Sequence, residues 1–168
     1  RAAARTFGSE AEVLPFGSIV QGAHLQGSDL DLCVDLPDEA LDPGPRAGKV
    51  DNGRQVSALK RLMAMLPLAF RVKETRLFRH IRVPIVIHCF TSPSGEQVET
   101  DISVGATQGG VEKGHTDTLI RRVLARSPQA VHTVRLVKHW AKTQGLHKAF
   151  DGYLNSLGWT LLALHWLA

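Results

Sequence analysis

The stretch GSDLDLCVDL, residues 27–36, places aspartates at alternating positions within an apolar run. Successive side chains of a β-strand point to opposite faces, so Asp29 and Asp31 share one face while Leu30 and Leu32 share the other. Unpaired carboxylates removed from water cost on the order of several kcal/mol each. The pattern predicts a strand with one face in the core and a divalent cation that compensates the carboxylates. A polar strand face open to water is the alternative.

The spacing of the carboxylates identifies the candidate ligands. Asp29 and Asp31 lie about 6.6 Å apart along a strand, a separation that suits two Mg²⁺ ions roughly 3.5–4 Å apart. Asp35 shares their face but lies about 13 Å from Asp31, which favours a strand-end position over a ligand role. A third ligand must come from a neighbouring strand. In GEQVETDISV, residues 95–104, Asp101 has the required phase.

Composition narrows the class of protein. The chain has 168 residues, of which 43% are hydrophobic and 21% charged, and its formal net charge is +4. These values are typical of a globular protein, and a mildly basic balance suits a phosphate-rich partner.

The final stretch, GWTLLALHWLA, is too short to span a membrane, so no membrane association is expected. The two cysteines are expected to be free thiols, and the eight histidines show no zinc-ligand spacing.

Periodicity and turn residues predict a mixed α/β sheet with flanking helices, followed by the start of a helical domain. The domain boundaries are placed at 1–110 and 111–168. The expected elements are the end of a helix in 1–10, a strand running into a turn at 13–22, a strand at 29–36, a surface loop at 37–53, a helix at 53–67 ended by Pro67, a central strand at 82–90, a strand at 95–104, and helices at 112–126, 129–143 and 153–168.

The stretch FGS, residues 16–18, ends the first predicted strand, and ten residues separate Ser18 from Asp29. A glycine at a tight turn lets a phosphate approach backbone amides, and the Ser18 hydroxyl adds a donor. A phosphate cradle beside two carboxylates is the arrangement that nucleotidyl transfer requires.

The stretch that contains both the glycine turn and the first two aspartates resembles the signature of the DNA-polymerase-β-like nucleotidyltransferases. It reads FGSIVQGAHLQGSDLDL and covers residues 16–32. The resemblance is closer to the non-canonical poly(A) polymerases and terminal uridylyltransferases. It continues through RVPIVIHCF, TDISV, VRLVKHWAKTQGL and GYLNSLGWTLLALHWL in the order found in that family.

The resemblance implies roles for individual residues. Asp29 and Asp31 would bind both of two Mg²⁺ or Mn²⁺ ions, and Asp101 would bind only the one that activates the attacking hydroxyl. Gly17 and Ser18 would hold the triphosphate. The remaining nucleotide-binding positions that the resemblance implies are Ser28, Asp117, Thr118, Lys138, Lys142, Asn155, Ser156 and Leu157.

The lysines also have a plainer interpretation. Arg135, Lys138 and Lys142 form one stripe of a predicted helix, and such a stripe is commonly a solvated face. The resemblance instead implies that Lys138 and Lys142 contact the β- and γ-phosphates, and it leaves Arg135 without a role.

The sequence departs from the family pattern in the region of nucleoside recognition. Leu157 stands where the family has a tyrosine that stacks on the base, and Asp117 stands where an asparagine is usual. Gly105 and Ala106 replace paired asparagines. The choice between UTP and ATP therefore cannot be predicted.

The expected function is template-independent addition of nucleotides to an RNA 3′ end from NTP, by an intracellular enzyme of the mitochondrion or the cytoplasm. One alternative is a catalytically degenerate relative that acts as a structural or RNA-binding subunit of a larger assembly. Another is a small-molecule nucleotidyltransferase or toxin–antitoxin partner of the same superfamily.

The C-terminal stretch is apolar on nearly every side, which is typical of a helix inside a larger core. Because the sequence begins at Arg1 and stops within this helix, we expect a piece of a longer protein. We also expect further sequence or a partner chain to cover the helix.

Overall fold

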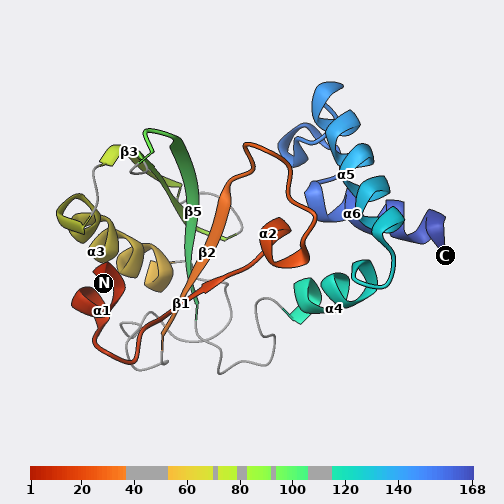
Figure 1. The fold of residues 1–168 in the computed structure, drawn as a ribbon. Coiled ribbons are helices and arrows are strands. Elements are labelled where there is room, and N and C mark those ends of the chain that lie inside the picture. The colour runs from red at the N-terminus through yellow and green to blue at the C-terminus, as the bar shows by residue number, and fades with distance from the viewer. Residues whose placement is uncertain (37–52, 70–71, 79–82, 92–93, 106–114) are drawn as a thin grey trace. The chain divides into compact units, whose positions relative to one another are not determined.

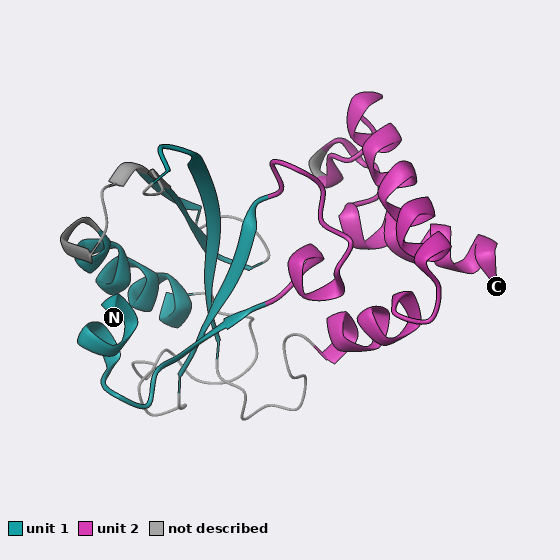
Figure 2. Cartoon of the chain, viewed as in Figure 1, with its two compact units in different colours: residues 1–15, 29–113 teal, residues 16–28, 114–168 magenta. Residues whose placement is uncertain are grey.

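The computed structural model describes residues 1–36, 53–69, 72–78, 83–91, 94–105 and 115–168. The chain forms two compact units, drawn in different colours in Figure 2. Residues 1–15 and 29–113 make up the sheet unit, and residues 16–28 and 114–168 make up the helical unit. The units are therefore interleaved in sequence. Ala106 and all but the last residue of the loop expected at 37–53 lie outside the described residues.

The sheet unit contains one five-stranded mixed sheet with the strand order β1-β2-β5-β4-β3 (Figure 1). Strands β2 and β5 are parallel, and the other neighbours are antiparallel. The mixed sheet with flanking helices confirms the predicted fold class. The elements of this unit are α1 (Ala2–Phe7), β1 (Glu12–Pro15), β2 (Leu30–Asp35), α3 (Gly53–Ala69), β3 (Val72–Phe78), β4 (Ile85–Thr91) and β5 (Gln97–Gly105).

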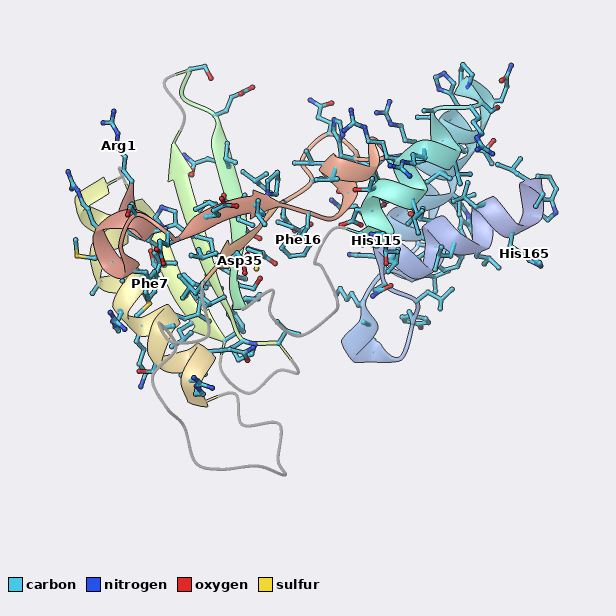
Figure 3. All side chains as sticks on the ribbon, turned by 90° about the horizontal axis from the view of Figure 1, so that it is seen from below. Arg1, Phe7, Phe16, Asp35, His115 and His165 are labelled. Atoms are coloured by element: carbon cyan, nitrogen blue, oxygen red, sulfur yellow. The ribbon has the colours of Figure 1, made fainter. Side chains whose placement is uncertain are left out.

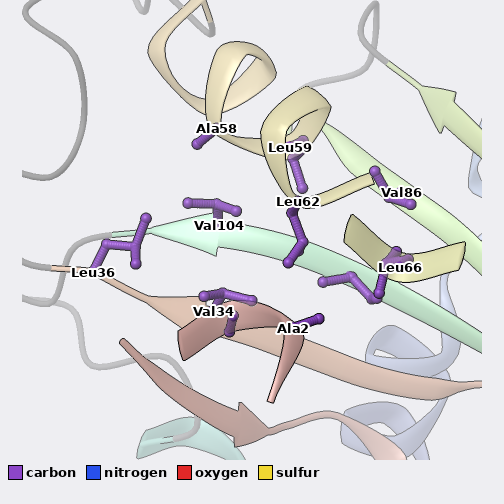
Figure 4. Close-up of a cluster of buried hydrophobic side chains, with 11 residues drawn as sticks. Ala2, Val34, Leu36, Ala58, Leu59, Leu62, Leu66, Val86 and Val104 are labelled. Atoms are coloured by element: carbon purple, nitrogen blue, oxygen red, sulfur yellow. The ribbon is translucent and has the colours of Figure 1, made fainter. Parts of the chain in front are cut away.

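One face of the sheet packs against α1 and α3 (Figure 4). The helical spacing of the apolar residues of α3 buries Leu59, Leu62 and Leu66, each no more than 3% exposed. Burying a leucine side chain contributes about 1.5–3 kcal/mol, so this contact fixes α3 on the sheet. The strand residues of the same core alternate along β2 and β5: they are Leu32, Val34, Ile102 and Val104. The residues that alternate with these along β2 and β5 lie on the opposite face of the sheet.

Three local predictions differ from the structure. Helix α3 continues past Pro67 to Ala69, because the φ that proline imposes is helical and the lost hydrogen bond falls in the last turn. Strand β3 was not predicted at all. Its sequence, VKETRLF, lacks a run of apolar residues because β3 is an edge strand with β4 as its one neighbour. The predicted strand and turn at 13–22 are a strand followed by the short helix α2 (Ser18–Gln21).

The helical unit contains α2, α4 (His115–Leu124), α5 (Pro128–Thr143), a 3₁₀ turn (Ala149–Asp151) and α6 (Ser156–Leu167). Its core is formed by Ala23, Ile120, Leu124, Ala130, Val134 and Ala163. Helix α5 begins with the Ser127 hydroxyl accepting a hydrogen bond from the Ala130 amide, and with proline at its first position. Ala23 belongs to this core although it precedes β2, so the β1–β2 connection is part of the helical unit.

Helix α6 leaves apolar side chains exposed, as its sequence indicates. The exposed ones include Trp166, which is 81% exposed, together with Leu161, Leu162 and Leu167. That another protein surface covers this helix remains a prediction. None of the helices in the described part of the chain has the length and apolarity needed to cross a membrane.

Candidate active site

Two of the three predicted metal ligands lie on neighbouring parallel strands. Asp31 of β2 is directly opposite Asp101 of β5 in the strand register. Residues opposite one another on paired strands share a face of the sheet. Their neighbours in sequence, Leu32 and Ile102, are in the core with α3, so Asp31 and Asp101 lie on the face opposite that core. The predicted phase of Asp101 is therefore confirmed.

Asp101 has the electrostatic character of a cation ligand. Its Oδ1 atom is buried and makes no hydrogen bond with any of the described residues. Burial, reinforced by the negative charges of Asp29, Asp31 and Glu99, raises the pKa of Asp101 from 3.8 to about 6. Removing a carboxylate from water beside like charges is unfavourable unless a cation or a proton compensates it.

Asp29 is held less firmly than the other two aspartates. It is exposed and precedes the first residue of β2, so no strand pairing fixes its backbone. Asp35, labelled in Figure 3, is the last residue of β2 and lies four residues beyond Asp31, as expected for a strand-end residue. Within the described ranges, no three His, Cys, Asp or Glu side chains come close enough to hold a metal ion by themselves. The negative charges of Asp29 and Asp31 act on Asp101, but the three described side chains do not form a closed cage.

This arrangement fits a magnesium ion that is completed by a substrate. Mg²⁺ is usually bound through one or two protein carboxylates, with water and substrate phosphates filling the remaining positions. Asp31 and Asp101 are paired in register, and the buried Asp101 oxygen makes no hydrogen bond within the described part of the chain, so the two residues supply such a partial ligand set.

The predicted phosphate turn belongs to the helical unit. Gly17 has φ 71° and ψ −150°, a backbone conformation open essentially to glycine alone. Its amide donates a hydrogen bond of 2.7 Å to Oδ2 of Asp117. Ser18 is the first residue of α2 and is half-buried. The positive φ of Gly17 agrees with the glycine turn expected from the sequence, and contact of this turn with phosphate stays a prediction.

The two lysines of α5 differ in their surroundings. Lys138 is 7% exposed, and its ammonium group donates a 2.8 Å hydrogen bond to the carbonyl of Ala23. Lys142 lies in the last turn of α5 and is exposed. Arg135, to which the resemblance gave no role, donates a 3.0 Å hydrogen bond to the carbonyl of Gly22. Both Arg135 and Lys138 thus contact the chain that follows α2.

The remaining predicted nucleotide-binding residues take ordinary structural positions. Asn155 caps α6 by accepting a 2.8 Å hydrogen bond from the Gly158 amide, and the exposed Ser156 is the first residue of that helix. Leu157 packs against the helical core, and Thr118 is exposed on α4. The Ser28 hydroxyl accepts a hydrogen bond of 3.0 Å from the Leu25 amide and so closes the turn before β2.

The model of one protein family matches residues 1–115: "Poly(A) RNA polymerase, mitochondrial-like, central palm domain". The match covers the whole sheet and both strands that carry the aspartates. The chain belongs to this family. Membership of the poly(A) RNA polymerase-like nucleotidyltransferases confirms the resemblance on which the sequence analysis relied.

Relatives of this palm domain include the terminal uridylyltransferase cid1 of Schizosaccharomyces pombe. The two are 25% identical over 158 residues, which cover 94% of this chain and 35% of the relative. The chain thus spans about a third of the length of the curated relative it matches.

Solved structures confirm the fold. The Cid1 poly(U) polymerase with MgGTP bound matches 95% of this chain and 44% of its own, with a TM-score of 0.70 and 24% identity. The non-canonical poly(A) polymerase complex GLD-2–GLD-3 matches 99% and 48%, with a TM-score of 0.74 and 22% identity. At these identities the structures establish a shared fold.

Sequence reasoning missed the contacts that hold the phosphate turn in place. Gln21 is 4% exposed, and its side-chain amide donates a 2.6 Å hydrogen bond to Oδ1 of Asp117. Asp117 and Gln21 are 96 residues apart, so neither periodicity nor spacing could connect them. No signal in the sequence marks Gln21, because the burial of a glutamine is not visible in a single sequence.

Proposed function

We propose that this chain is the catalytic palm region of an RNA 3′-terminal nucleotidyltransferase, which adds UMP or AMP from NTP without a template. Family membership supports nucleotidyl transfer to RNA. The observation that carries the proposal is the register pairing of Asp31 with Asp101, whose buried oxygen makes no hydrogen bond with the described residues. The relative from Schizosaccharomyces pombe is a uridylyltransferase, and the family model is that of a poly(A) polymerase, so both nucleotides remain candidates.

The chemistry is an in-line displacement. The 3′-hydroxyl oxygen of RNA forms a bond to the α-phosphorus of the NTP, and the bond to the bridging oxygen breaks to release pyrophosphate. Two bound Mg²⁺ ions would lower the pKa of the attacking hydroxyl and stabilise the leaving oxygen. Asp29, Asp31 and Asp101 would hold them, and Asp101 would be mostly ionised at neutral pH because its pKa is about 6.

The rest of the nucleotide site is proposed from the family resemblance. The Ser18 hydroxyl would donate to the triphosphate, and Lys142 would place positive charge near its outer phosphates. Thr118, Asn155 and Ser156 would contact the nucleoside. Leu157 would offer an apolar surface in place of an aromatic ring, which weakens base stacking.

A primer-extension assay tests the proposal. A labelled RNA is incubated with Mg²⁺ and each of the four NTPs in turn, and products are resolved on a gel. We expect extension with UTP or ATP, and none with the Asp29→Ala variant. Asp29 is exposed and lies outside the strand, so its removal should leave the fold unchanged. RNA binding without extension by any NTP would contradict the proposal.

That outcome would support a second candidate, a non-catalytic RNA-binding subunit. The position of Leu157 favours it, because this side chain packs against the helical core in the place where the family has an aromatic ring. The two candidates make the same prediction for RNA binding and opposite predictions for extension.

The two lysines of α5 should respond differently to substitution. Lys142→Ala is expected to raise the KM for NTP by about tenfold, with no change in melting temperature, because an exposed charge leaves no unpaired partner. Lys138→Ala should also lower the melting temperature, because it leaves the Ala23 carbonyl without its buried donor. Filter binding of RNA serves as the control. Equal losses of NTP and RNA binding on removal of Lys142 would indicate a general basic surface.

A further inference from the structure

The carboxylate of Asp117 connects α4 to the phosphate turn through both of its oxygens. Oδ2 accepts the Gly17 amide at 2.7 Å, and Oδ1 accepts the Gln21 side-chain amide at 2.6 Å. Hydrogen bonds to an ionised acceptor are shorter and roughly twice as strong as neutral ones. Asp117 is 8% exposed, so little water competes for these bonds. Asp117 therefore binds both ends of α2: Gly17, which precedes the helix, and Gln21, its last residue.

The backbone of the turn requires glycine. Gly17, at φ 71° and ψ −150°, occupies a region that other residues essentially never adopt. Glycine adopts many other conformations with similar ease, so a contact must select this one. The hydrogen bond from the Gly17 amide to Asp117 fixes the orientation of this peptide.

The far end of the same segment is held independently. Arg135 donates to the Gly22 carbonyl at 3.0 Å, and Lys138 donates to the Ala23 carbonyl at 2.8 Å. An acidic side chain therefore holds an amide before α2, and two basic side chains hold carbonyls after it. All three partners are more than 95 residues away in the sequence. The turn is shaped by the helical unit and not by its own sequence alone.

We propose that Asp117 is a positioning residue, whose carboxylate holds the Gly17–Ser18 turn in the conformation that receives the triphosphate of the NTP. The inference rests on the proposed function, because it assigns the turn to the triphosphate. One consequence concerns the donors that the turn offers. The Gly17 amide is engaged by Asp117, so phosphate must be bound by other donors of the turn, among them the Ser18 hydroxyl.

The chemistry of the carboxylate provides a discriminating pair of variants. Asp117→Ala removes both acceptors. Asp117→Asn keeps one acceptor for the Gly17 amide, and its NH₂ group can donate to Gln21 once the Gln21 amide rotates by half a turn. Alanine should therefore release the turn and asparagine should retain it. Asp151→Ala, an exposed aspartate of the same unit, is the matched control.

The test uses the full chain, with steady-state kinetics against the NTP that supports extension and with amide hydrogen exchange at Gly17 followed by NMR. We expect Asp117→Ala to raise the KM for NTP about 10- to 100-fold, to change kcat by less than about threefold, and to speed Gly17 exchange at least about tenfold. Asp117→Asn and Asp151→Ala should stay within about threefold of wild type in each quantity. Gln21→Leu, which removes one of the two anchors, should give an intermediate KM and tests the idea if the alanine variant does not fold.

The outcomes separate this inference from the proposed function. Unchanged KM and unchanged Gly17 exchange in Asp117→Ala, or in Gln21→Leu if it alone folds, would overturn the positioning role. A loss of kcat at constant KM would overturn it too, because it would indicate a role in the chemical step. If wild type uses no NTP but Gly17 exchange still accelerates in Asp117→Ala, the anchoring is correct and the proposed function fails.

Discussion

Replacing Asp31 by alanine is expected to reduce nucleotide addition by about a thousandfold or more, while the protein remains folded. Asp31 is opposite Asp101 on the neighbouring strand, and its charge helps to raise the pKa of Asp101. Its removal takes away one of the two carboxylates that are fixed by strand pairing. The same removal relieves repulsion between like charges, so the melting temperature should be unchanged or slightly higher.

Asp35→Ala is the matched control for this variant. Asp35 lies on the same strand and the same face as Asp31 but four residues further along. It should retain extension activity within about threefold of wild type, because its carboxylate is too far along the strand to share an ion with Asp31. Extension is measured by gel, and folding by thermal denaturation. Wild-type extension by Asp31→Ala would show that the chemistry lies elsewhere, and loss of cooperative unfolding would show that Asp31 is structural.

The sequence was sufficient to predict the strand pair and its carboxylates, because strand alternation is a local rule. Leu30, Leu32 and Val34 alternate with Asp31 and Asp35. Once the apolar residues are assigned to the buried face, the aspartates must therefore lie on the opposite face. The same rule placed Asp101 in phase on a strand some seventy residues away. Edge strand β3 was not predicted, because it pairs with one neighbour and contains several charged residues. Its sequence therefore shows no regular alternation of apolar and polar residues.

The environment of the phosphate turn could not be predicted in the same way. The requirement for glycine at residue 17 was visible, because FGS before a second strand indicates a tight turn. The partners of the turn were not visible, because Asp117, Arg135 and Lys138 reach it across separations of 100, 113 and 115 residues. These contacts exist because residues 16–28 fold with the helical unit. Nothing local in the sequence indicates that a connection between two strands packs with distant helices.

Replacing Asp101 by asparagine is expected to abolish nucleotide addition and to stabilise the metal-free protein at neutral pH. Burial, and then the charges of Asp29, Asp31 and Glu99, raise the pKa of Asp101 from 3.8 to about 6. The folded protein therefore binds a proton at Asp101 more tightly than the unfolded chain does. Stability from this group is greatest at low pH and is lost as the pH rises from about 4 through about 6. Above that range the ionised carboxylate costs on the order of 2 kcal/mol in the free energy of unfolding.

The measurement is chemical denaturation of wild type and Asp101→Asn between pH 4 and pH 8 without divalent cations. The two proteins should be equally stable near pH 4, and the variant should gain its full advantage above about pH 7. Burial lowers the pKa of His88, which gives an opposing pH dependence of stability, but that effect is common to both proteins and cancels in the difference.

Glu99→Gln, an exposed position on the same strand, controls for loss of charge alone and should give a much smaller gain in stability. Mg²⁺ with NTP should stabilise wild type more than Asp101→Asn, because in wild type a bound cation also replaces the proton as compensation for the Asp101 carboxylate. A stability difference that is independent of pH would contradict the raised pKa, and equal stabilisation of both proteins by Mg²⁺ and NTP would place the metal site away from Asp101.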